Sequence, residues 1–314
     1  MYEEAPPLKV WAYCALVVFT VLFLFLFYSY SGYGPYGKAL ERCNRSLTDA
    51  LIENNTQDTS AISVVILGSS LTERALLDPR EVENAIYKKT KKRANVLRVA
   101  IYSMNMRLAE RIDLFGYISK YPPQYLIIEN FCMNLDDENV AKLLPTPIDA
   151  SLLYLRNYLR KTMHLATFED YYIKWYTYDT KPLPGNEFYT DKFDSTTFKT
   201  LQRKKNVVRK VSQNANANKA YDTLSRRNTK IIFLDMPQSD ELQTNFLDKS
   251  ATAELNKLLE DYKQQYDIDY WQYPVIGNES FIMNDSCFRD GIHVNYKGAM
   301  KYQEWFSSQF ATLK

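Results

Sequence analysis

The chain has 314 residues, of which 46% are hydrophobic, and it contains only 9 Gly and 4 Cys. This composition excludes a disordered chain, a collagen and a disulfide-rich miniprotein. The 39 Lys and Arg residues nearly balance the 37 Asp and Glu residues, and the net charge of +2 is too small to hold a polyanion by bulk charge. We therefore expect no nucleic-acid partner.

The first predicted element is a run without charge that reaches from Val10 to Tyr30. At about 1.5 Å per residue, a helix over this run would be about 31 Å long, which matches the hydrocarbon core of a bilayer. Aromatic residues that suit membrane interfaces lie at both ends, namely Trp11, Tyr13, Tyr28, Tyr30 and Tyr33. The run therefore predicts a transmembrane helix over residues 10–30, preceded by a tail of residues 1–9.

A cleaved signal peptide is the alternative to this anchor. Ser29 and Ser31 are small residues at a spacing that suits cleavage, whereas Glu3, Glu4 and the length of the apolar run are untypical of a signal peptide. We favour the anchor. Its direction is left open by charge, because a weak excess of basic residues after the run would place the C-terminal side in the cytoplasm, but a large domain can be exported against so small a bias.

The rest of the chain divides into residues 31–60, a tether and helical stalk with a helix around Ala39–Glu53, and residues 61–314, which have an α/β pattern. Four short apolar runs predict strands, namely Ile62–Leu67, Val96–Ile101, Tyr125–Ile128 and Lys230–Asp235. Helices are predicted over Leu71–Leu77, Arg107–Lys120, Asp149–Leu165, Ala251–Tyr266 and Ala299–Phe310. Near-continuous apolar strands alternating with helices indicate a parallel sheet covered on both faces, which binds ligands at the carboxyl ends of its strands.

A long helical insertion, about residues 145–225, separates the third and fourth predicted strands. A connection of this length usually carries its own helices and often covers a site. Its aromatic stripe from Tyr171 to Tyr178 is typical of core packing, with contact to sugar rings, a membrane or a partner helix as the alternative. A basic helix is expected around Thr200–Ser212, and the alternating Asn and Ala of Ser212–Lys219 predict a loop.

Nucleophilic hydrolysis requires an activated hydroxyl, a base and donors for the oxyanion. The chain has two His residues, and His164 is expected to pack or cap within an apolar helical stretch. His293 follows Asp290 by three residues and precedes the last predicted helix, so the carboxylate could fix the tautomer of the imidazole at the carboxyl edge of the sheet. Ser70 brings a hydroxyl to the same edge, although Ser70 and Glu73 also fit a helix-capping box.

Two segments resemble the first and last blocks of the SGNH, or GDSL, hydrolase superfamily, and they are Gly68-Ser69-Ser70-Leu71 after the first strand and Asp290 with His293 before the last helix. The resemblance implies a flavodoxin-like three-layer α/β/α domain in which Ser70 is the nucleophile, His293 the general base and Asp290 its orienting partner. It also implies an oxyanion hole with donors from Ser70, Ser103, Asn134 and Asn130, with Asn134 preferred over Asn130. The two middle blocks of the superfamily are altered in this chain.

The anchor and the insertion resemble the membrane-anchored SGNH proteins that work with membrane-bound O-acyltransferases. This resemblance implies a single-pass membrane protein with an extracytoplasmic C-terminal domain. It also implies a serine esterase or O-acyltransferase that acts through an acyl-serine on acyl groups, most simply acetyl, of cell-surface polysaccharide. The implied partners are the lipid bilayer, a membrane-bound O-acyltransferase and acylated carbohydrate.

We expect no metal and no other cofactor, because Cys43, Cys132 and Cys287 lack the spacing of a zinc site. A second hypothesis comes from another class of protein. In it the domain is a catalytically degenerate SGNH domain that serves as a binding or assembly subunit of a membrane O-acyltransferase complex, in keeping with the altered middle blocks.

Overall fold

The computed structural model describes residues 7–76, 78–101, 104–130, 146–167, 215–239, 249–273, 281–290 and 292–313. The chain forms two compact units. The first comprises Met1–Arg45 and Ala141–Tyr176, and the second comprises Ser46–Val140 and Thr177–Lys314. The predicted aromatic stripe and the predicted basic helix of the insertion lie outside the described residues.

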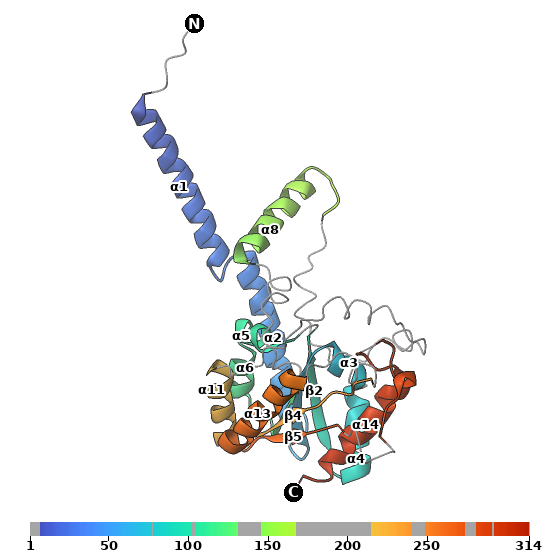
Figure 1. Ribbon diagram of the computed structural model, residues 1–314. Coiled ribbons are helices and arrows are strands. Elements are labelled where there is room, and N and C mark those ends of the chain that lie inside the picture. Colours follow the sequence, from blue (N-terminus) through green and yellow to red (C-terminus); the bar gives the residue numbers. More distant parts are fainter. Residues whose placement is uncertain are drawn as a thin grey trace. The chain divides into compact units, whose positions relative to one another are not determined.

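Helices make up the described part of the first unit. They are α1 (Leu8–Tyr30), the start of α2 (Pro35–Thr56) and α8 (Pro147–Thr162), which Figure 1 labels. Helix α1 carries no charged residue after Lys9, and most of its large apolar side chains are exposed. By length and composition α1 could be a membrane span or a signal sequence. His164 directly follows the C-cap of α8 and is exposed, so it does not pack, whereas its left-handed backbone at the end of the helix fits the capping alternative.

A five-stranded, fully parallel sheet organises the second unit. Its strands are β1 (Ile62–Gly68), β2 (Ala94–Ala100), β3 (Tyr125–Glu129), β4 (Lys230–Leu234) and β5 (Asp269–Trp271). The spatial order is β2-β1-β3-β4-β5, the flavodoxin-like order of doubly wound folds. The predicted parallel sheet and α/β fold class are therefore confirmed, with one strand more than the sequence predicted.

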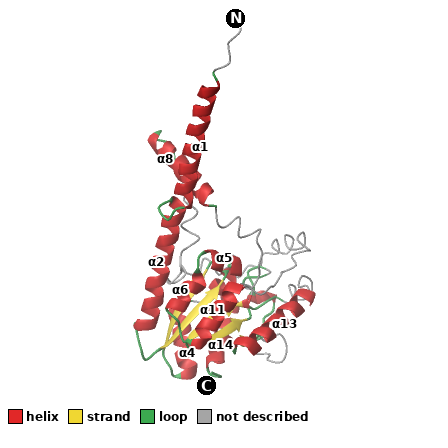
Figure 2. Ribbon diagram, turned by 90° about the vertical axis from the view of Figure 1, so that its left-hand side faces the viewer, coloured by secondary structure: helices red, strands yellow, loops and turns green. Residues whose placement is uncertain are grey.

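Helices cover both faces of this sheet. On one face α14 (Tyr296–Phe310) packs on α4 (Pro79–Thr90) and α3 (Ser70–Ala75). On the other face α11 (Ala215–Arg226) packs on α6 (Leu114–Lys120), α13 (Lys249–Tyr266) and β4. Figure 1 shows the strands between the two groups, and Figure 2 shows them in yellow among the red helices. The second unit is a three-layer α/β/α domain.

Each face of the sheet packs against aromatic side chains of its own helix layer. Side chains of β1 such as Val64 and Ile66 pack under the aromatic face of α14, which buries Tyr302 and Phe306. On the opposite face the fully buried ring of Tyr221, in α11, makes edge contacts with the rings of Phe233 and Tyr262. Alternate residues of each buried strand thus face different helix layers, as expected of a parallel sheet covered on both sides.

Two helix predictions need correction. The predicted helix Arg107–Lys120 is two short helices, α5 (Met106–Arg111) and α6, because Asp113 between them has a left-handed backbone with φ 53°. The predicted loop Ser212–Lys219 is helical from Ala215 onward, where α11 begins. Ala217 of this segment is buried on the same helix face as Leu224, and burial of that face outweighs the weak helix propensity of Asn.

Candidate active site

Strand order places the candidate site. Ligands of doubly wound sheets bind outside the carboxyl ends of the strands, where the strand order reverses, and here that point lies between β1 and β3. Ser69 and Ser70 follow the end of β1, and Glu129 and Asn130 stand at the end of β3. The predicted nucleophile therefore lies at the position where the fold favours a binding site.

The turn after β1 is packed too tightly for any residue but glycine at position 68. A Cβ on Gly68 would lie 2.0 Å from Oγ1 of Thr72 and 2.9 Å from a carboxylate oxygen of Glu129. This close approach lets the chain pass directly from the buried strand into α3. Ser70, the first residue of that helix, is held at the strand end as a result.

The carboxylate of Glu129 holds this turn from the neighbouring strand. Glu129 is fully buried and accepts four hydrogen bonds. Two come from Ser69, whose backbone N–H and Oγ lie 2.7 and 2.6 Å from the carboxylate. Two come from Thr72, whose backbone N–H and Oγ1 lie 3.2 and 2.5 Å away. The four donors of Ser69 and Thr72 thus all find their acceptor on one buried side chain, which ties the turn to the end of β3.

Helix α3 is capped by Ser69 rather than by Ser70. The backbone N–H of Leu71 donates to Oγ of Ser69 at 3.1 Å, and Ser69 has the extended backbone of an N-cap residue. The capping-box interpretation of Ser70 is therefore wrong by one residue. This shift leaves the Ser70 hydroxyl available for another contact, and Oγ of Ser70 lies 3.0 Å from Nε2 of His293.

The loop before α14 carries His293 and Asp290. An antiparallel bridge between Phe288 and Val294 closes the loop, and the backbone N–H of Arg289 donates to the carbonyl of His293 at 2.8 Å. The Asp290 carboxylate accepts the backbone N–H groups of Ile292 and His293 at 3.0 and 2.7 Å. Side-chain and backbone hydrogen bonds thus connect the described residues on either side of position 291.

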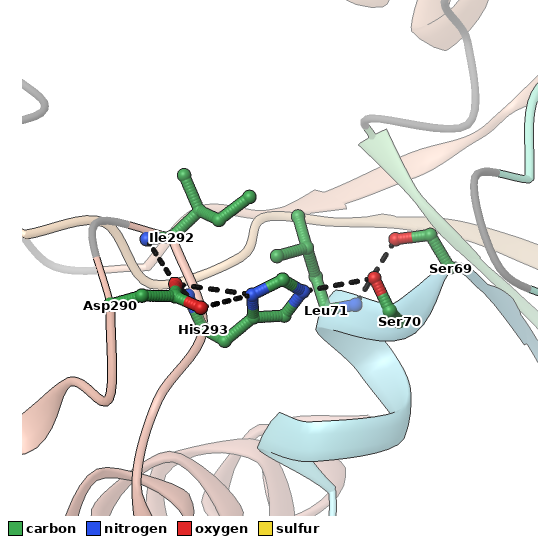
Figure 3. A network of polar contacts seen from close by, with 6 residues as sticks. All are labelled: Ser69, Ser70, Leu71, Asp290, Ile292 and His293. Carbon is green, nitrogen blue, oxygen red and sulfur yellow. Dashed lines mark hydrogen bonds and ion pairs between the residues drawn. The ribbon is translucent and has the colours of Figure 1, made fainter. Parts of the chain in front are cut away.

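The imidazole of His293 bridges the two predicted partners, as Figure 3 shows. Nδ1 of His293 lies 2.9 and 3.1 Å from the two carboxylate oxygens of Asp290, and Nε2 faces Oγ of Ser70. The side chains of His293 and Asp290 are each only 17% exposed. The structure therefore brings Ser70, His293 and Asp290 into one continuous chain of hydrogen bonds.

The charge of Asp290 determines which groups donate and which accept in these hydrogen bonds. Burial raises the pKa of Asp290, but the hydrogen bond and charge of His293 and the two backbone N–H groups outweigh burial and leave the pKa below its usual value. Asp290 is then ionised at neutral pH and accepts the Nδ1–H of His293. When the imidazole is neutral, this hydrogen bond leaves the lone pair on Nε2 facing Ser70, which is the arrangement a general base needs to take the hydroxyl proton.

Asn295 supports the loop from behind, and the sequence analysis did not single it out. This residue is buried, its Oδ1 accepts the N–H of Gly298 at 3.1 Å and caps α14, and its Nδ2 donates to the carbonyl of Ser286 at 2.7 Å. It thereby ties the start of the last helix to the segment before Asp290. An Asn ahead of an amphipathic helix is an N-cap signal that could have identified it.

The predicted oxyanion donors are only partly described. Ser103 and Asn134 lie outside the described residues. Asn130 is buried, and its Nδ2 donates to a carboxylate oxygen of Asp235 at 2.8 Å, so part of its donor capacity is already used. In the described part of the chain, no residue accepts a hydrogen bond from the backbone N–H of Ser70. The composition of the oxyanion hole stays a prediction.

Asp235, at the end of β4, is a buried acid beside the site. Burial raises its pKa to about 7, against the hydrogen bonds from Asn130 and from the backbone N–H groups of Tyr273 and Met236. The folded protein therefore keeps this carboxyl largely neutral up to about pH 7, whereas an unfolded chain ionises it above about pH 4.

Stability should accordingly fall as the pH rises through this window. The unfolded state loses the proton first, so the contribution of Asp235 is complete below about pH 4 and is lost progressively up to about pH 7, by about 4 kcal/mol. Urea unfolding of wild type and Asp235→Asn at pH 4, 6 and 8 tests this expectation. The free energy of unfolding of the variant should rise relative to that of wild type as the pH increases. Asp267→Asn, at a side chain that is 94% exposed, is the control. Parallel pH profiles for wild type and Asp235→Asn would contradict the assignment.

Comparisons with known proteins were made by sequence and by structure. No protein-family profile and no curated protein matches the sequence. The solved structures to which the chain is similar include a GDSL-like lipase from Bacteroides thetaiotaomicron, with 14% identity, coverage of 87% of this chain and 98% of that chain, and a TM-score of 0.38. They also include a lipase/acylhydrolase from Enterococcus faecalis, with 11% identity, coverage of 79% and 95%, and a TM-score of 0.36. These values are too low to carry a functional argument, which rests on the side chains of the site.

Proposed function

We propose that this protein is a serine esterase or O-acyltransferase that works through a covalent acyl-Ser70. The observation that carries the proposal is the hydrogen-bonded chain from Ser70 through His293 to Asp290 at the carboxyl edge of the sheet. In a nucleophile activated in this way, the base lies within hydrogen-bond reach of the hydroxyl and is itself oriented by a third group. Both conditions are met here.

The proposed reaction has two halves. Oγ of Ser70 attacks the carbonyl carbon of an ester while Nε2 of His293 takes the hydroxyl proton, and the tetrahedral intermediate then expels the alcohol, which receives that proton. Water or a sugar hydroxyl next attacks the acyl-serine, with His293 again as base, and Ser70 leaves with the proton. Asp290 stays ionised throughout and stabilises the imidazolium that forms twice in each cycle.

The finer features of the function belong to the same proposal. Helix α1 would anchor the chain in a membrane, with the C-terminal domain on the extracytoplasmic side. The substrate would be acyl groups, most simply acetyl, of cell-surface polysaccharide, and a membrane-bound O-acyltransferase would be the partner. The charge-free run of α1 from Val10 to Tyr30 and the aromatic residues at both ends support the anchor.

A fluorophosphonate probe tests the catalytic part of the proposal directly. Such a probe phosphonylates an activated serine, so wild type should be labelled at Ser70, and both Ser70→Ala and His293→Ala should lose the label. Ser60→Ala, which removes an exposed serine hydroxyl, should label like wild type. Equal labelling of Ser70→Ala and wild type, or no labelling of wild type, would favour the degenerate assembly subunit instead.

A further inference from the structure

Helix α8 presents an apolar stripe that no described residue covers. Four residues spaced three or four apart lie on one side of the helix and are 46–60% exposed, namely Leu152, Leu155, Leu159 and Met163. Residues at this spacing lie above one another on a helix surface. Two exposed tyrosines, Tyr154 and Tyr158, extend the stripe along one border. A stripe of this length requires an apolar environment.

The C-terminal half of α8 carries three basic side chains. Arg156, Arg160 and Lys161 follow one another along the C-terminal half of the helix, and the one acidic residue, Asp149, belongs to the capping box with Thr146. A helix with an apolar side, tyrosines at its border and several basic side chains has the composition of one that lies flat in a membrane interface. The positive charges favour anionic lipid headgroups over a neutral protein surface.

Helix α8 begins against the C-terminal turn of α1. The two helices pack together, and the small residues Ser29, Ala150 and Ser151 are buried, which permits a close approach of the two backbones. Figure 1 and Figure 2 both show α8 beside this end of α1. If α1 spans a bilayer, its C-terminal turn lies at the interface, because Tyr28 and Tyr30 belong to that turn.

We propose that α8 is an interfacial helix that lies in the leaflet from which α1 emerges. Its leucine stripe enters the boundary between acyl chains and headgroups, and its Arg and Lys side chains bind phospholipid phosphates. This inference rests on the proposed membrane anchoring by α1. The protein then holds the bilayer at two places, by one spanning helix and by one helix in the plane of the membrane.

Spin labels on the full chain in vesicles of phosphatidylcholine with phosphatidylglycerol test this placement. The native cysteines are replaced, retention of fluorophosphonate labelling is checked, and one nitroxide is attached at Leu155→Cys, Lys161→Cys or Val18→Cys. The nitroxide at positions 155 and 18 should collide more often with oxygen, which enters the bilayer, than with a nickel chelate, which stays in water. The nitroxide at position 161 should collide more often with the nickel chelate. Removal of phosphatidylglycerol should shift the label at position 155 toward water and leave the label at position 18 unchanged.

The label at Val18 separates failure of the inference from failure of the anchor. A lipid-exposed label at position 18 with a water-exposed label at position 155 would overturn the interfacial helix and keep the anchor. A label at position 155 that neither reagent reaches would also overturn the inference, since the stripe would then be covered by protein. Water exposure at both positions would overturn anchor and inference together, while fluorophosphonate labelling would still report on the catalytic proposal.

Discussion

Replacing Ser70 by alanine should lower the hydrolysis of p-nitrophenyl acetate by at least about a thousandfold. The variant loses the atom that becomes acylated in the proposed mechanism, and the hydroxyl of the preceding residue, Ser69, is bonded to Glu129 and Leu71 rather than to His293. Initial rates at saturating ester, with the full chain in detergent, measure the effect.

His293→Ala should cost about as much, and the double variant should be no slower than either single one. Residues that act as one unit lose their joint contribution once, so their effects do not multiply. The hydrolysis rate of Ser60→Ala should stay within about twofold of that of wild type, because substitutions at the surface, away from the site, have small effects. A double variant whose loss equals the product of the single losses would show that Ser70 and His293 act independently, against the proposed mechanism.

Glu129→Leu should reduce the free energy of unfolding by at least about 3 kcal/mol. The substitution leaves three buried donors without an acceptor, the N–H and Oγ of Ser69 and the N–H of Thr72, and each unsatisfied buried group costs about 1–3 kcal/mol. Oγ1 of Thr72 keeps only the weak sulfur acceptor of Met236 at 3.8 Å. Urea unfolding followed by tryptophan fluorescence is a suitable measurement, since Trp271 and Trp305 are buried in the core of the domain.

Two further variants calibrate this result. Glu129→Gln keeps an oxygen acceptor but points an amide N–H₂ at donors, so it should be less stable than wild type and more stable than Glu129→Leu. Glu304→Leu makes the same change at a side chain that is 61% exposed and should change stability by less than about 0.5 kcal/mol. If Glu129→Leu were no less stable than Glu304→Leu, the turn after β1 would be held by other contacts.

The strands that the sequence predicted are those with a strong local signal. Strands β1 to β4 can be recognised from sequence, because strands buried on both faces are short, nearly continuous apolar runs rich in β-branched residues and bounded by turn residues. Strand β5 has only three residues, Asp269 to Trp271, and it forms by pairing with the edge of β4. So short a segment has no recognisable pattern in the sequence, because the strand depends on a tertiary contact. Helix α4, which was not predicted, does have a local signal, the Asp78 cap with Pro79 at the first helical position.

Part of the candidate site could be predicted from sequence and part could not. The meeting of Ser70, Asp290 and His293 was predicted by the resemblance of their two segments to the SGNH superfamily, together with the place of Ser70 at the carboxyl edge of a parallel sheet, and the structure brings the three side chains together. The contact of Glu129 with the nucleophile turn depends on the pairing of β1 with β3 and on the missing side chain at Gly68. Sequence shows an acid at a strand end but does not show that its acceptors are all used within the fold.

The separation of the site residues along the chain has a consequence for biosynthesis. Ser70 and His293 are 223 residues apart, and His293 is held by the segment that caps α14, the last described helix. During translation α1 and the nucleophile turn emerge early, whereas the base emerges after every strand of the sheet. Under the proposed mechanism, a nascent chain therefore lacks the base for Ser70 until the segment that carries His293 has been made and has folded beside it, so ester turnover would report on completed folding of the domain.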